Sequence, residues 1–69
     1  MPAVTVNGKL MSLPDGATVQ DVVEAAGAAE GGRGVAVALD GEVVPRGQWS
    51  ATTLEDGREV EVLHAVQGG

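Results

Sequence analysis

The segment 4–26 reads VTVNGKLMSLPDGATVQDVVEAA, and this stretch decides the order of the elements that follow. Its first valines alternate with a polar residue, as in a strand with one buried face. Asn7-Gly8 then predicts a two-residue hairpin turn, because both residues tolerate a positive φ. Residues 9–13 return as the second strand, with Met11 and Leu13 expected to point inward.

A helix is predicted in the second half of the same stretch. Thr18 is a suitable N-cap, and Asp21, three residues later, completes a variant of the capping box. Gly27 is expected to end the helix. One apolar stripe forms at helical spacing, from Val19, Val22, Val23 and Ala26. A helix of about two to three turns is marginal alone, so it must be held by packing on a sheet.

Three more strands are expected after the helix, at residues 35–39, 42–44 and 59–62. The first is a nearly continuous apolar run, and the last alternates glutamate with inward-facing valine. Asp40-Gly41 provides a turn between the first two, and Pro45 closes the second because it cannot donate to an interior ladder. Residues 48–53 are expected to hold a short 3₁₀ turn, with Trp49 covering one end of the core.

The resulting order is hairpin, helix, two strands and a final strand. It predicts an α+β fold, a mixed sheet of four to five strands with one main helix across one face. The first and last strands are expected to lie side by side and parallel at its centre. A chain of 69 residues has room for a single domain, residues 1–69, and residues 65–69 are expected to form a flexible C-terminal tail.

The composition excludes several classes of function. Ten acidic and four basic residues give a net charge of −6, which argues against binding nucleic acid or an anionic membrane. The acidic surface could serve solubility alone or attract a basic patch on a protein partner. Without cysteine there is no disulfide and no thiolate metal site, and no signal peptide precedes the first strand, so a cytoplasmic location is expected.

The C-terminal Gly68-Gly69 is the feature that could carry chemistry. The residues from His64 to Gly69 could span about 20 Å when extended, enough to reach into another protein's active site. A carboxylate activated by ATP as an acyl adenylate becomes open to attack by a sulfur nucleophile, which leaves a thiocarboxylate. Because the chain has no cysteine, its terminal carbonyl is the only plausible place to carry sulfur. A frayed chain end is the alternative interpretation.

Several motifs together resemble the ThiS family of thiamine-pathway sulfur carriers, in the ubiquitin-like β-grasp superfamily. The most specific are Val44-Pro45-Arg46 followed by Trp49, then the segments 54–57 and 66–69. Asn7 at the hairpin also fits the family. Arg58 departs from the pattern, since the family often has an acid there, and the absence of Phe and Tyr is a second departure.

The resemblance implies a carrier protein that is not itself an enzyme. Gly69 would be adenylated by a ThiF-like enzyme that uses ATP and Mg²⁺, while the carrier binds no cofactor tightly. Sulfur-delivery proteins would supply the sulfur for a Gly69 thiocarboxylate, and a ThiG-like thiazole synthase would accept it. The free carrier is expected to be a monomer, with no nucleic-acid or membrane partner.

The partner contacts are expected near the end of the last strand. Leu63 lies out of phase with the buried valines, so it should share the uncovered sheet face with Ala65. Glu59 and Glu61 either form a solvated strand face or meet basic residues of the activating enzyme, and Arg46 is either a contact or part of a strand end. The tail residues Val66, Gln67 and Gly68 complete this set. No acid stands at ligand spacing from His64, so a metal site is not expected.

Three other functions remain open on the residues alone. A MoaD-like carrier would have the same fold but deliver sulfur to another acceptor, such as molybdopterin. A ubiquitin-like modifier would end as an isopeptide on a target, although Lys9 is the only lysine here for building chains. A simple adaptor would use the sheet face and no terminal chemistry.

Overall fold

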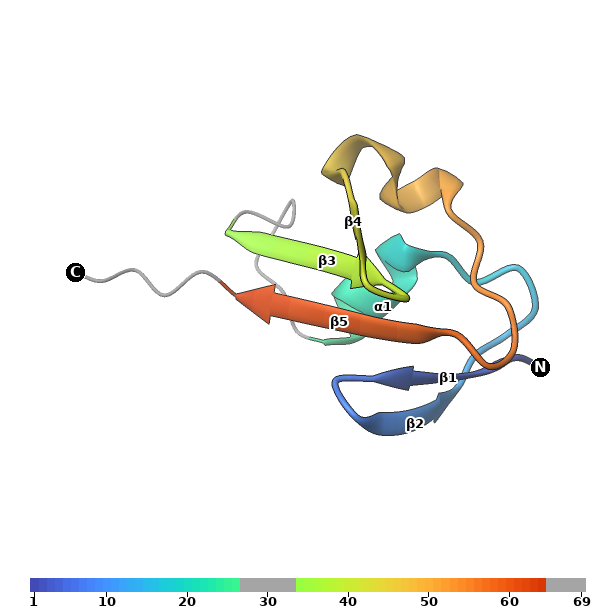
Figure 1. Cartoon of the computed structure of the whole chain (residues 1–69). Coiled ribbons are helices and arrows are strands. Elements are labelled where there is room, and N and C mark those ends of the chain that lie inside the picture. Colours follow the sequence, from blue (N-terminus) through green and yellow to red (C-terminus); the bar gives the residue numbers. More distant parts are fainter. Residues whose placement is uncertain (27–33, 65–69) are drawn as a thin grey trace.

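A five-stranded sheet with one α-helix across one face makes up the described part of the chain, residues 1–26 and 34–64 of a computed structural model (Figure 1). The elements in chain order are β1 (Ala3–Val6), β2 (Lys9–Ser12), α1 (Val19–Ala25), β3 (Val35–Leu39), β4 (Glu42–Val44), the 3₁₀ helix η2 (Arg46–Ala51) and β5 (Glu59–His64). The predicted order of hairpin, helix, two strands and final strand is confirmed.

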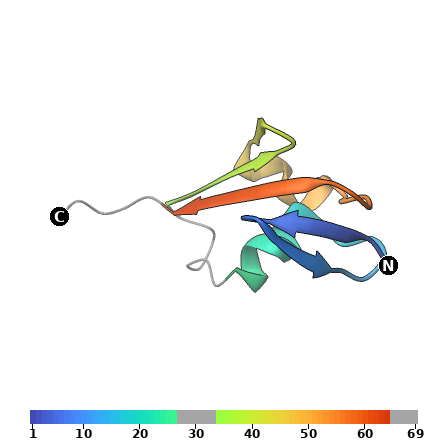
Figure 2. The same cartoon turned by 60° about the horizontal axis from the view of Figure 1, so that its bottom comes forward.

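The strands are arranged in the order β2-β1-β5-β3-β4. β1 pairs in parallel with β5, with Thr5 opposite Glu59 and Val6 opposite Val60, whereas the other neighbours are antiparallel. Figure 2 shows β1 and β5 side by side with their arrowheads pointing the same way. The predicted parallel contact between the first and last strands is therefore confirmed, and the fold is an α+β, ubiquitin-like β-grasp.

The core lies between the sheet and α1 and is built from aliphatic side chains around one tryptophan. Its buried members are Val4, Val6, Leu13, Ala17, Val19, Val22, Val23, Val37, Val44, Trp49, Leu54, Val60 and Val62. Trp49 is only 1% exposed, and its Nε1–H donates to the carbonyl oxygen of Val44 at 2.9 Å. The prediction that Trp49 closes the core is confirmed.

The helix start follows the prediction, and its end differs from it. The hydroxyl of Thr18 accepts a hydrogen bond from the backbone N–H of Asp21, whose carboxylate accepts one from the N–H of Thr18, so the capping box is complete. The helix ends at Ala25, and Ala26 is an exposed C-cap. Placing Ala26 on the buried stripe was wrong, because helical phase is lost at that residue. Gly27, the expected helix end, lies outside the described residues.

The 3₁₀ helix η2 begins at Arg46, two residues before the predicted turn. Pro45 precedes it with φ −59°, and the Pro45 carbonyl accepts the N–H of Gln48 at 2.8 Å. Because proline fixes φ, the 3₁₀ helix begins directly after Pro45. The residue types after Pro45 do not indicate this earlier start.

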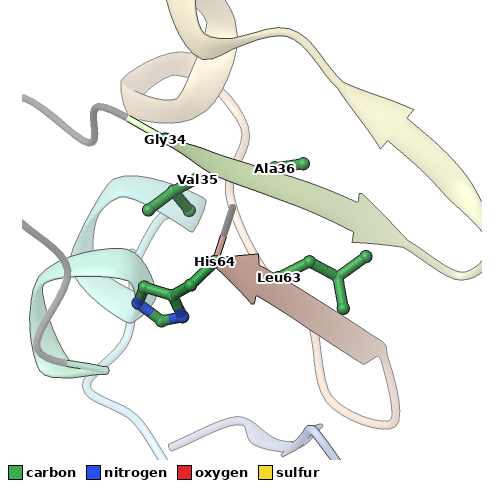
Figure 3. Close-up of a pocket in the computed structure, with 5 residues that line it drawn as sticks. All are labelled: Gly34, Val35, Ala36, Leu63 and His64. Atoms are coloured by element: carbon green, nitrogen blue, oxygen red, sulfur yellow. The ribbon is translucent and has the colours of Figure 1, made fainter. Parts of the chain in front are cut away.

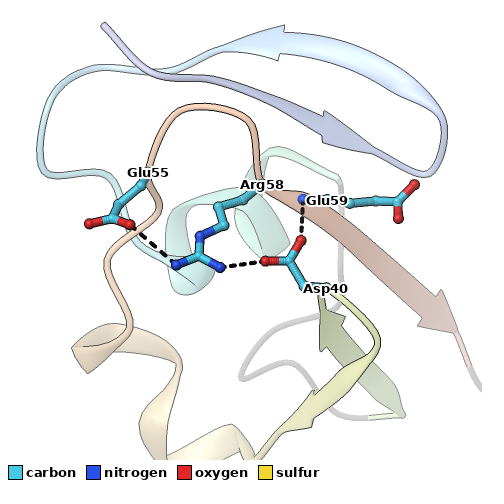
Figure 4. A network of polar contacts seen from close by, with 4 residues as sticks. All are labelled: Asp40, Glu55, Arg58 and Glu59. Atoms are coloured by element: carbon cyan, nitrogen blue, oxygen red, sulfur yellow. Dashed lines mark hydrogen bonds and ion pairs between the residues drawn. The ribbon is translucent and has the colours of Figure 1, made fainter.

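A polar network fixes the beginning of β5 against the β3–β4 turn (Figure 4). The guanidinium of Arg58 donates to the carboxylate of Asp40 at 2.6 Å and to that of Glu55 at 3.2 Å. Asp40 also accepts the backbone N–H of Glu59 at 3.0 Å. This backbone hydrogen bond, and then the Arg58 contact, lower the pKa of Asp40, so its carboxylate stays ionised further into the acid range than an ordinary aspartate. Arg58, one departure from the family pattern, thus has a structural role.

Candidate functional site

The end of β5 is the part of the fold that leads to the predicted site of chemistry. β5 is the middle strand of the sheet, and it ends at His64, opposite Val35 at the start of β3. Ala65, Val66, Gln67, Gly68 and Gly69 lie outside the described residues. The structure therefore describes β5 up to His64, and the predicted roles of residues 65–69 stay predictions.

The two faces of β5 differ sharply in exposure. Val60 and Val62 are buried under α1, whereas Glu59, Glu61 and Leu63 point to the opposite face of the sheet and are exposed. Leu63 is 62% exposed, a large fraction for a leucine on a central strand. The expected position of Leu63 on the uncovered face is confirmed, because strand side chains alternate between faces.

Leu63 belongs to an apolar patch that continues across two neighbouring strands. It lies opposite Ala36, while Ala38, two residues further along β3, lies opposite Val43 on β4. Val43 is 76% exposed. These four residues, Leu63, Ala36, Ala38 and Val43, form what we call the open-face patch. Within the described part of the chain, no helix packs on this face.

Sequence reasoning missed Val43, although a signal was present. Val43 precedes the buried Val44 on a short strand, so the two must face opposite sides of the sheet. Leu10 is also 76% exposed, but it lies on β2 at the other edge, opposite Thr5, and Thr5 in turn lies opposite Glu59. Leu10 is therefore separated from Leu63 by β1 across the sheet and lies level with Glu59, at the opposite end of β5 from Leu63.

Acidic groups border the patch, and Arg46 stands further away. Glu61 lies opposite Ala38 within the same row as Val43. β4 and β5 both run antiparallel to β3, so Arg46, just after β4, is at the same end of the sheet as His64. β4 is two strand positions from β5, about 10 Å across the sheet. The structure thus brings Glu61 and Leu63 together and leaves Arg46 at the sheet edge.

A shallow hollow lies where β5 ends and β3 begins (Figure 3). Its volume is about 360 Å³, and it is lined by Gly34, Val35, Ala36, Leu63 and His64. Val35 and His64 project to one side of the sheet, whereas Ala36 and Leu63 project to the other. The hollow therefore lies at the end of the sheet, has a largely apolar lining and shares Ala36 and Leu63 with the open-face patch.

Asn7, in the turn after β1, contacts the same end of β5 on the side away from β3. Sequence reasoning missed this contact. Its side-chain Oδ1 accepts the backbone N–H of Val62 at 2.8 Å, and its Nδ2 donates to the Val62 carbonyl at 3.1 Å. The hairpin motif predicts Asn7 as a turn residue, but no local pattern indicates a partner 55 positions away.

Metal and membrane sites have no support in the described residues. Among the described residues, 1–26 and 34–64, no group of three or more His, Asp or Glu side chains could hold a metal ion. No helix in that part of the chain is long and apolar enough to cross a membrane.

Comparisons with known proteins point to one family. The sequence profile of the ThiS family matches residues 4–69. The crystal structure of a thiamine biosynthesis protein (ThiS) from Geobacter metallireducens is 36% identical, with a TM-score of 0.77, over 97% of this chain and 99% of that one. The solution NMR structure of a thiamine biosynthesis protein from the same organism gives 36% identity and a TM-score of 0.78, over 97% and 87% of the two chains. No curated protein sequence matches this chain.

Proposed function

The chain belongs to the ThiS family, and we propose that this small sulfur carrier of thiamine biosynthesis holds its sulfur as a thiocarboxylate on Gly69. The observation that supports this most is that the family profile runs through to Gly69. The similar ThiS structure is matched over 99% of its own length. The absence of cysteine adds support, because no side chain of this protein can carry a persulfide.

The proposed reaction cycle is carried out by partner enzymes. A ThiF-like enzyme, with ATP and Mg²⁺, converts the Gly69 carboxylate into an acyl adenylate and releases pyrophosphate. A persulfide on a sulfur-delivery protein displaces AMP and forms an acyl disulfide, and a second thiol of the delivery system then attacks its S–S bond, which leaves the thiocarboxylate on Gly69 and a disulfide on the delivery system. A ThiG-like thiazole synthase then takes the sulfur for the thiazole ring. Adenylation matters because a carboxylate is a poor acyl donor at neutral pH, whereas AMP is a good leaving group.

The open-face patch and its acids are the proposed docking surface for these enzymes. A partner that covers Leu63 and Val43 buries apolar area that the free protein leaves in water. Glu59 and Glu61 on the same face favour a partner with basic residues around an apolar spot, and the charge of −6 attracts such a surface over longer range. Ala65 and Arg46 are proposed as further contacts.

Intact-mass spectrometry tests the proposed chemistry directly. Incubation with a ThiF-like enzyme, ATP, Mg²⁺ and a sulfur source should replace one oxygen of the protein with sulfur, and fragmentation should place the change at Gly69. Omission of ATP is the control and should leave the mass unchanged. If complete reactions leave it unchanged too, the proposal is wrong. A denaturant-resistant ladder of adducts would instead indicate a protein modifier.

Truncation of Leu63 tests the docking surface. Leu63→Ala should raise the KM for charging by about tenfold, because full burial of a leucine side chain is worth about 1.5–3 kcal/mol and about 1.4 kcal/mol corresponds to a factor of ten. Leu10→Ala is the matched control, since Leu10 is the same residue type and is 76% exposed but lies outside the open-face patch, on the edge strand β2. Steady-state kinetics of pyrophosphate release measure both variants. Equal KM values for Leu63→Ala and the unmodified protein would show that Leu63 is not part of the docking surface.

A further inference from the structure

β5 extends further than its parallel neighbour β1. β1 ends at Val6, where the chain turns into the hairpin, whereas β5 continues to His64. The last backbone hydrogen bond between them runs from the N–H of Asn7 to the carbonyl of Val60, at 2.9 Å. From Val62 onward, β5 has backbone pairing only with β3.

The carboxamide of Asn7 takes the place of the missing part of β1. In a continued parallel ladder, the N–H and C=O of Val62 would both bond to backbone groups of the neighbouring strand. Here the Asn7 Oδ1 accepts from that N–H at 2.8 Å, and its Nδ2 donates to that C=O at 3.1 Å. One side chain therefore satisfies both polar groups of a residue whose own side chain is buried.

The turn alone does not require this side chain. Asn7 has φ 50° and Gly8 has φ 84°, and glycine at either position would satisfy that geometry. The β3–β4 turn gives an internal comparison, because Asp40 also has φ 50° and also bonds to β5 through its side chain. Asp40, however, bonds to Glu59 at the beginning of β5, whereas Asn7 bonds to Val62 near its end.

We propose that Asn7 is a positioning residue, whose carboxamide holds the end of β5 so that Leu63 and His64 keep a fixed relation to the sheet. This inference rests on the proposed function. In the proposed function an activating enzyme binds the open-face patch and the terminal carboxylate together, and Leu63 of that patch and Gly69 both follow Val62 in the chain. Without the carboxamide, Val62 has no hydrogen-bond partner on the β1 side of β5. Leu63 and the terminal carboxylate are then less often in the relative position that the enzyme binds.

The test uses Asn7→Gly and Asn7→Asp in the full chain, with Asp40→Gly as the matched control. Asn7→Gly keeps the turn and removes the side chain. Asn7→Asp keeps the shape and the acceptor, but it has no donor for the Val62 carbonyl. Asp40→Gly makes the same backbone change in the other hairpin, at the far end of β5. Charging kinetics are measured at a temperature where all variants are fully folded.

The first readout is hydrogen exchange. In Asn7→Gly, the Val62 amide should exchange at least about tenfold faster, because its acceptor is lost. The Thr5 amide, which donates to the Arg58 carbonyl at 2.9 Å, should change much less. Asp40→Gly should accelerate Glu59 instead. An equal acceleration of Val62 and Thr5 would mean that Asn7 affects only global stability, and the inference would be wrong.

The second readout is kcat/KM for charging at Gly69, which should fall about tenfold in Asn7→Gly, less in Asn7→Asp, and little in Asp40→Gly. If the unmodified protein is charged and Asn7→Gly is charged equally well, the positioning role is refuted while the proposed function stands. If the unmodified protein itself is never charged, the proposed function fails, and this inference fails with it.

Discussion

A variant that ends at Gln67 should fold normally and never accept sulfur. The buried core of the described residues extends from Val4 to Val62, so deletion of Gly68 and Gly69 removes none of its members. The fold should therefore keep its melting temperature. The terminal carboxylate, however, would belong to Gln67, which has a side chain. The extended chain would also be about 7 Å shorter than in the unmodified protein. In a narrow active site this displacement should abolish adenylation, measured by ATP–pyrophosphate exchange and intact mass.

A control of unchanged length and unchanged tail accompanies this test. Leu10→Ala changes an exposed leucine of the edge strand β2 and leaves residues 65–69 as they are, so it should be charged at close to the normal rate. The comparison also decides against the adaptor interpretation, in which the sheet face acts without terminal chemistry. If the shortened protein still supports thiazole formation, the last two glycines are dispensable and Gly69 is not the sulfur-carrying residue.

The fold could be predicted largely from local patterns. Alternating valines define β1 and β5, and Asn7-Gly8 and Asp40-Gly41 mark two tight turns, in which positive φ is observed at all four residues. These signals are strong because each depends on the steric limits of a few adjacent residues. The errors lie at element ends, as at Ala26, where a helix loses its phase after only seven residues. Local sequence does not fix such boundaries.

The candidate site was less predictable because its contacts join distant residues. Leu63 could be placed on the open face by alternation alone. The contact between Asn7 and Val62 depends on the register of β1 against β5, which only the assembled sheet fixes. Arg58 likewise reaches Asp40 from the other end of a long connection. The open-face patch needed the pairing of three strands, although each strand alone shows which of its residues face outward.

Trp49→Ala should unfold a large fraction of the protein at room temperature. Trp49 is the only aromatic residue of the chain and is 1% exposed, so no other large side chain can fill the space it leaves. Truncation of a buried tryptophan typically costs about 3–5 kcal/mol. A domain of 69 residues has a total stability of only about 3–10 kcal/mol at the usual value per residue. Circular dichroism with urea titration measures the loss.

Trp49→Phe separates the packing of the ring from its hydrogen bond. Phenylalanine keeps much of the apolar volume but cannot donate to the Val44 carbonyl, which the Trp49 Nε1–H now satisfies at 2.9 Å. An unsatisfied buried carbonyl costs about 1–3 kcal/mol, so this variant should stay folded with a lower urea midpoint. Because Trp49 packs under the sheet and not on its open face, folded Trp49→Phe should still be charged at Gly69. A Trp49→Ala midpoint close to that of the unmodified protein would show that the core does not depend on this side chain.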